Sequence, residues 1–119
     1  MDCNICVMTG DREFTGVKAR GLWDTGTSVT VITPAIAAKL HMEPLGGYSM
    51  NGLGGVQQSW LTVGFLRFPN GAVWGPIHMA VHDLPNTDVL IGMDVISCGT
   101  FTIRRKPDGG TLFTFDMNV

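Results

Sequence analysis

One carboxylate of this sequence lies in a setting suited to acid–base catalysis. Asp24 opens the run Asp24-Thr25-Gly26 directly after the apolar pair Leu22-Trp23. Two aspartates that lie close together cannot both ionise, so such a pair shares one proton and contains both an acid and a base. The sequence contains a single Asp-Thr-Gly. A shared-proton pair would therefore need a second copy of the chain, related to the first by two-fold symmetry.

A second motif strengthens this interpretation. Leu90-Ile91-Gly92 places glycine after two apolar residues, far downstream of the aspartate. In this combination the sequence resembles the retropepsin-like aspartic proteases. Asp94 makes it more similar to the cellular and bacterial members than to the viral ones, many of which carry Arg where this chain has Met93. The resemblance implies an aspartic endopeptidase that hydrolyses peptide bonds in extended segments of a peptide or protein substrate, at a homodimer interface formed by two copies of Asp24, with no cofactor and no metal.

The resemblance also assigns roles around the catalytic Asp24. Thr25 would direct its hydroxyl to the backbone of the second copy. Gly26 lacks a Cβ, so the chain can pass close to the carboxylates and aim an N–H at them. Thr27 carries a hydroxyl that can donate a hydrogen bond to Asp24. Gly92 is expected where two backbones approach closely. The residues expected to support the catalytic Asp24, Thr25 and Gly26 are Thr27, Ser28, Leu90, Ile91 and Gly92.

A glycine-rich segment matches the substrate-binding flap of the same family in position and composition. Its residues are Asn51, Gly52, Leu53, Gly54 and Gly55. A flap must close over an extended peptide to exclude bulk water and then open to release product, and glycine lowers the cost of that motion. We therefore expect a hairpin in this part of the chain with its tip near these residues.

The rest of the sequence reads as short strands separated by turn residues. We expect a strand over Phe14 to Leu22 and a hairpin of Leu61 to Phe68 with Ala72 to Val81, joined by Pro69-Asn70-Gly71. Short helices are expected after the N-cap Thr33, ending near His41, and over Met93 to Cys98. A last hairpin should join Phe101 to Arg105 and Thr111 to Phe115. The pattern predicts an all-β fold, a small closed acid-protease-like barrel with a flap hairpin and one or two short helices.

Length and composition limit the alternatives. The chain of 119 residues fits a single retropepsin-like domain over residues 1–119, one half of a symmetric protease, because it is too short for two such lobes. A net charge of −2 and a pI near 5.8 give no basic surface for nucleic acid. The sequence has no secretory signal and no apolar stretch of bilayer-spanning length, so we expect no membrane partner and a cytoplasmic protein, unless a leader or anchor has been trimmed.

Two rival functions come from other classes. The first is a non-catalytic homodimeric protein-binding module that retains the retropepsin-like fold. The second is a metal or redox protein that uses Cys3, Cys6 and Cys98, although Cys3 and Cys6 alone supply only half of a zinc site and are more simply free thiols on a strand. His78 and His82 add little, because their context predicts a strand rather than a helix.

Overall fold

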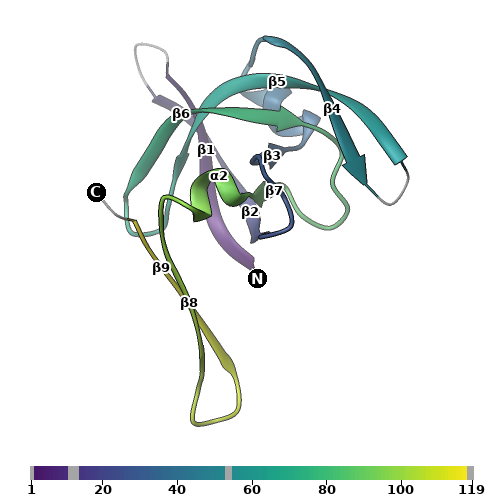
Figure 1. Cartoon of the computed structure of the whole chain (residues 1–119). Helices are drawn as coiled ribbons and strands as arrows, with labels where there is room; N and C mark the ends of the chain where they lie inside the picture. The colour runs from purple at the N-terminus through teal and green to yellow at the C-terminus, as the bar shows by residue number, and fades with distance from the viewer. Residues whose placement is uncertain (1, 11–13, 53–54, 118–119) are drawn as a thin grey trace.

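The computed structural model describes residues 2–10, 14–52 and 55–117. Within them the chain forms nine strands and two short helices, shown in Figure 1. In chain order the elements are β1 (Asp2–Gly10), β2 (Phe14–Trp23), β3 (Val31–Ile32), α1 (Pro34–Lys39), β4 (Gly46–Gly52), β5 (Gly55–Arg67), β6 (Val73–Val81), β7 (Val89–Ile91), α2 (Met93–Ile96), β8 (Gly99–Arg105) and β9 (Thr111–Met117).

Six of the strands close into a barrel. They neighbour one another in the order β1, β2, β7, β3, β6, β5, and β5 returns to pair with β1 over Cys6 to Met8. The long strand β5 changes register between Gly64 and Leu66, and such an irregularity bends a strand so that it can serve more than one partner. The all-β barrel with two short helices expected from the sequence is confirmed.

The interior of the barrel is apolar and comes from almost every strand. Buried side chains alternate along β7, where Val89 and Ile91 are fully buried, and occupy both faces of the short strand β3, where Val31 and Ile32 are fully buried. The helix α1 closes one side through Ile36 and Ala37. The core cluster consists of Ile5, Val7, Ala19, Ile32, Ile36, Ala37, Leu40, Leu66, Met79, Val81, Val89, Ile91 and Val95.

The expected hairpins are present. The β5–β6 turn is closed by the N–H of Gly71, which donates to the carbonyl oxygen of Phe68 at 2.9 Å, and Gly71 has a φ of +88° that suits glycine. β4 and β5 pair from Gly46–Leu61 to Gly52–Gly55 and form a hairpin beside the barrel (Figure 1). Of the residues expected at the flap tip, Asn51, Gly52 and Gly55 lie at the end of this pairing, and Leu53 and Gly54 lie outside the described residues.

Two details differ from the sequence pattern. The β-branched run 29–32 yields only the two-residue strand β3, because the N–H of Thr30 donates to the Asp94 carboxylate and not to a neighbouring strand. Thr33 occupies the N-cap position of α1, with Pro34 following it, but its side chain makes no capping hydrogen bond. None of the helices in the described part of the chain has the length and apolar character needed to cross a membrane.

Barrel closure depends on β1, and we predict that its core contacts dominate stability. Val7 is 0% exposed and pairs with Val17 on one side and Leu66 on the other. Val7→Ala should lower the free energy of unfolding by about 2 kcal/mol, because it leaves a cavity in a packed core. Val73→Ala, at a position 48% exposed, should cost less than about 0.5 kcal/mol. Urea unfolding of both variants at one protein concentration measures the difference, and equal losses would contradict the prediction.

Candidate active site

The barrel brings the two sequence motifs together at one edge. β2 and β7 pair in parallel, with Leu22 opposite Leu90 and Trp23 opposite Ile91. Their carboxyl ends therefore meet, so the segment that follows β2 lies against the segment that follows β7. The N–H of Asp24 donates to the carbonyl oxygen of Ile91 at 2.9 Å. The expected packing of the second motif beneath the aspartate loop is present in the structure.

The carboxylate of Asp24 is held by its own loop. The N–H of Gly26 donates to Oδ1 at 2.9 Å, and the hydroxyl of Thr27 donates to Oδ2 at 2.9 Å. Both donors were expected from the sequence. Because each carboxylate oxygen accepts one bond from a different residue, the plane of the carboxylate is fixed relative to the loop. The Asp24 side chain is half-buried, while Thr25, Gly26 and Ser28 are exposed. The carboxylate thus lies at an open surface of the barrel.

Gly92 permits the close approach that joins the two segments. A Cβ at this position would lie 2.8 Å from the carbonyl oxygen of Thr27 and 2.8 Å from the carbonyl carbon of Val29. Just beyond it, the N–H of Met93 donates to the carbonyl oxygen of Thr27 at 2.7 Å, and the N–H of Asp94 donates to that of Ser28 at 3.2 Å. The start of α2 therefore finds its backbone acceptors in the aspartate loop rather than in its own turn.

A buried polar contact at this junction was not predicted from the sequence. We call it the Thr30–Asp94 clamp. The N–H and hydroxyl of Thr30 donate to the two carboxylate oxygens of Asp94 at 3.0 and 2.9 Å, and the Thr30 hydroxyl oxygen accepts a bond from the N–H of Gly92 at 3.3 Å. Thr30 is fully buried. The available signals were a threonine inside an apolar β-branched run and an acid in the first turn of a short helix.

Aromatic side chains pack around Trp23, the residue at which the aspartate loop begins. The ring of Trp23, which directly precedes Asp24, stacks on Phe68 at a centroid distance of 5.9 Å and contacts Phe115 at 4.8 Å. Gly99 makes room for this cluster, since a Cβ there would lie 2.7 Å from the Phe115 ring. The contact joins β9 to β2, the strand that ends directly before Asp24. All three tryptophans, Trp23, Trp60 and Trp74, pack against the core as partly buried residues.

The remaining predicted site residues fall into two groups. Leu90 is half-buried and Ile91 is fully buried beneath the aspartate loop. Of the expected flap residues, Asn51 and Gly52 end β4 and Gly55 begins β5, whereas the expected positions Leu53 and Gly54 lie outside the described residues. The hairpin is therefore established by its backbone pairing, and its action as a flap is part of the proposal below.

The thiols are not gathered into a centre. Cys3 and Cys6 lie on β1 and Cys98 follows α2, each half-buried and outside any disulfide. Over residues 2–10, 14–52 and 55–117, no three His, Cys, Asp or Glu side chains lie close enough to hold a metal ion. No observation in this part of the chain favours the metal or redox alternative.

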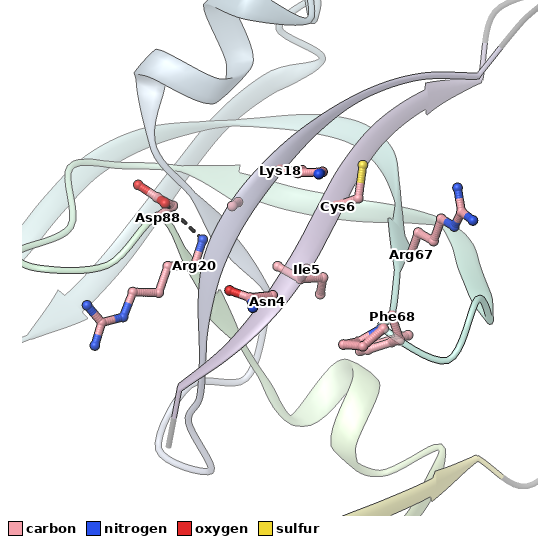
Figure 2. Close-up of a pocket in the computed structure, with 10 residues that line it drawn as sticks. Asn4, Ile5, Cys6, Lys18, Arg20, Arg67, Phe68 and Asp88 are labelled. Carbon is pink, nitrogen blue, oxygen red and sulfur yellow. Dashed lines mark hydrogen bonds between the residues drawn. The ribbon is translucent and has the colours of Figure 1, made fainter.

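A hollow of about 680 Å³ lies elsewhere, where β1 and β2 meet the β5–β6 turn. Among the charged residues that Figure 2 labels around it, Arg20 and Arg67 extend in opposite directions, and the carboxylate of Asp88 accepts a hydrogen bond from the backbone N–H of Arg20 at 2.9 Å. A ligand site needs polar groups that converge on one point. These side chains diverge, and Asp24 is not among the lining residues, so this hollow is not a candidate site.

Comparisons with known proteins agree on the family and on the fold. A family model described as aspartyl protease matches residues 11–95. The fold is similar to that of the EIAV protease complexed with the inhibitor HBY-793 (21% identity over 82% of this chain and 85% of that chain, TM-score 0.65). It is also similar to that of a retropepsin-like aspartic protease from Rickettsia conorii (18% identity over 92% of this chain and 88% of that chain, TM-score 0.55). The protease of Simian Foamy Virus (mac) has a similar fold as well (14% identity over 82% of this chain and 92% of that chain, TM-score 0.54). No curated protein sequence matches significantly.

We predict that Gly92→Ala disrupts this junction. Its Cβ would meet backbone atoms of Thr27 and Val29, which cannot rotate away, so the free energy of unfolding should fall by about 1–3 kcal/mol. Gly47→Ala is the matched control, because a Cβ at Gly47 meets nothing within 4 Å. Thermal unfolding of both variants measures the effect. A Gly92→Ala variant as stable as the control would show that the junction tolerates a side chain.

Proposed function

We propose, from the premise that this chain belongs to the aspartyl protease family, that it is an aspartic endopeptidase whose active site is completed by a second copy of itself. The match over residues 11–95 establishes the membership and makes the chain an aspartic peptidase, and it confirms the resemblance read from the motifs. The finer proposal concerns the assembly, the residues and the substrate.

One observation carries the proposal: a chain with a single Asp-Thr-Gly holds its Asp24 carboxylate fixed at an open surface. Hydrolysis by this chemistry needs two carboxylates that share a proton. A two-fold axis beside the loop would supply the second Asp24 and would bring Thr25, which is exposed, against the loop of the second copy. The half-site is thus chemically incomplete in one chain and complete in a symmetric pair.

The reaction follows from the shared proton. The ionised Asp24 takes a proton from a water molecule as the water oxygen attacks the scissile carbonyl carbon, while the protonated Asp24 gives its proton to the carbonyl oxygen. The tetrahedral species then collapses: the C–N bond breaks, and the leaving nitrogen takes a proton from the carboxyl that received one. The other Asp24 carboxylate takes back the proton from the hydroxyl formed on the carbonyl oxygen, which restores the shared proton. The bonds from Gly26 and Thr27 hold each carboxylate in position throughout. No metal or cofactor takes part in this scheme.

The β4–β5 hairpin is the proposed flap. The pairing of its two strands ends at Gly52 opposite Gly55. An extended peptide beneath the hairpin would be held by backbone hydrogen bonds and shielded from bulk water. This assignment makes an extended segment of a peptide or protein the substrate. Opening and closing of the hairpin would then control substrate entry and product release.

We predict that Asp24→Asn abolishes cleavage of a diverse peptide library between about pH 4 and about pH 7, because an amide can neither accept nor deliver the shared proton. Mixing wild type with an excess of Asp24→Asn should also suppress wild-type activity, since mixed pairs hold only one carboxylate. Cleavage is read by mass spectrometry of the library.

Val73→Ala, at an exposed position of β6 outside the site and the flap, serves as the unrelated variant in the same mixing experiment and should not suppress wild-type cleavage. Equal cleavage by wild type and Asp24→Asn would refute the enzymatic assignment. A folded wild type that binds peptides and cleaves none would favour the binding-module alternative. If Asp24→Asn loses activity but does not suppress wild type on mixing, the protease assignment would stand and the site shared between two chains would be refuted.

Substitution of Thr27 tests whether the hydrogen bond from its hydroxyl to the Asp24 carboxylate contributes to catalysis. Thr27→Ala removes one of the two donors to Asp24 and should lower kcat about tenfold with little change in KM, because a charge-assisted hydrogen bond contributes roughly 1.5 kcal/mol. Thr27→Ser keeps the hydroxyl and should retain most of the activity. Steady-state cleavage of one library-derived peptide gives both constants. A Thr27→Ser variant as impaired as Thr27→Ala would mean that the methyl group, and not the hydrogen bond, matters.

A further inference from the structure

We propose that the hollow where β1 and β2 meet the β5–β6 turn binds an acidic, extended segment of the polypeptide substrate through Lys18, Arg20 and Arg67. We call this surface the basic hollow. The inference rests on the proposed function, because it gives the peptidase a substrate class: polypeptides with acidic residues several positions away from the cleaved bond. The basic hollow would act beside the active site and not as part of it.

The fold gathers three cationic side chains on a chain that is acidic overall. The sequence has eight Lys and Arg residues and a net charge of −2. Lys18, Arg20 and Arg67 all line the basic hollow, and Asp88 is the one acid among its described lining residues. The Asp88 carboxylate already accepts a hydrogen bond from the backbone N–H of Arg20 at 2.9 Å. The local charge is thus opposite in sign to that of the whole chain, so this surface attracts acidic groups that the rest of the chain repels.

Barrel closure places two of these cations on either side of β1. Cys6 pairs with Lys18 of β2 and with Arg67 of β5, so the three side chains share one face of the sheet. That face is the outer one, because both cations are exposed, whereas the neighbouring Val7 and Leu66 are buried. Adjacent strands lie about 4.8 Å apart, which sets the backbones of the two cationic residues roughly 10 Å from each other.

Lys18 and Arg67 have no counter-ion on the chain. Among the described residues, neither side chain makes a hydrogen bond or an ion pair. Figure 2 shows that Arg20 and Arg67 point away from each other. Such diverging cations cannot enclose a small ligand, and for that reason the basic hollow is no candidate for the active site. They suit a longer partner whose negative charges are themselves spaced apart.

The spacing of the cations on β2 matches an extended polypeptide. Lys18 and Arg20 alternate with the buried Ala19, so both project from the outer face about 7 Å apart. Side chains two positions apart in an extended peptide are also about 7 Å apart on one side. A Glu-x-Glu segment beside β2 would therefore pair one carboxylate with each cation, and Arg67 would meet a further acid. A single small anion would reach one cation at a time.

The basic hollow adjoins the aspartate loop. Phe68 lines it, and its ring stacks on Trp23, the residue directly before Asp24, at a centroid distance of 5.9 Å. Arg20 precedes Asp24 by four residues, which corresponds to about 13 Å of extended chain. A substrate whose scissile bond lies at Asp24 would thus reach the hollow with residues about four positions from that bond.

The test compares two matched peptides that share one cleaved sequence from the library. One carries Glu-x-Glu about four residues from the cut and the other carries Gln-x-Gln, and each is made with this extension on either side of the cut. At low salt, wild type should cleave one acidic version with a kcat/KM about tenfold above that of its Gln counterpart, mainly through KM. The ratio should fall toward one at about 0.5 M salt, because exposed charges are screened.

Charge removal in the hollow identifies the groups responsible. The double variant Lys18→Gln with Arg67→Gln should lower the tenfold ratio to about one to twofold. Lys39→Gln, an exposed cation of α1 outside the hollow, is the matched control and should keep the ratio. Fluorescence anisotropy of the labelled acidic peptide, with each variant placed in the Asp24→Asn protein, measures binding without cleavage. Circular dichroism checks that every variant folds.

The outcomes separate this inference from the proposed function. Cleavage of both peptides at equal kcat/KM would overturn the basic hollow as a substrate site and leave the protease intact. A preference that the double variant retains would overturn the assignment to Lys18 and Arg67. Binding of the acidic peptide that the double variant loses, with no cleavage by wild type, would support the hollow and refute the proposed function. A single-stranded oligonucleotide that displaces the peptide at lower concentration would overturn the polypeptide as occupant.

Discussion

The structure depends on one constraint, the junction between the segment after β2 and the segment after β7. The parallel pairing of these strands sets the two segments side by side, and Gly92 lets their backbones approach within the distance that a side chain would forbid. The Thr30–Asp94 clamp then joins them by charge-assisted hydrogen bonds inside the barrel, where such bonds are least screened. The position of Asp24 follows from this junction, because its N–H is bonded to Ile91 and its carboxylate is held within the same loop.

This arrangement explains why the half-site is rigid and yet exposed. The interactions that fix Asp24 all come from behind or from within the loop: Ile91 below it, Gly26 and Thr27 beside it, and Trp23 at its start. None of them uses the outward surface, where Thr25 is exposed. If a second copy completes the site as proposed, a preformed carboxylate with an exposed outward surface would meet its symmetry mate without first rearranging, which would lower the ordering cost of assembly. Control of activity would then reside in association, since only the associated form holds a complete site.

The sequence predicted what is local and missed what depends on tertiary pairing. The donors Gly26 and Thr27 were predictable because they lie within three residues of Asp24, and Gly92 because its motif lies next to the aspartate loop in the family pattern. The clamp was not, because Thr30 and Asp94 are 64 positions apart and meet only when β2 pairs with β7. The hairpin of β8 and β9 was predicted, but its separation from the barrel sheet was not, because the alternation along these strands is the same in a free hairpin and in one that joins a barrel.

The central claim is that one functional site is built from two chains, and the most direct test is the stoichiometry of a transition-state mimic. A statine-type inhibitor carries a hydroxyl that replaces the attacking water between the two carboxylates, so each site should bind one molecule. Native mass spectrometry of the wild-type protein with saturating inhibitor should show one inhibitor bound per two chains. One inhibitor bound per single chain, with the chain still monomeric, would contradict the account.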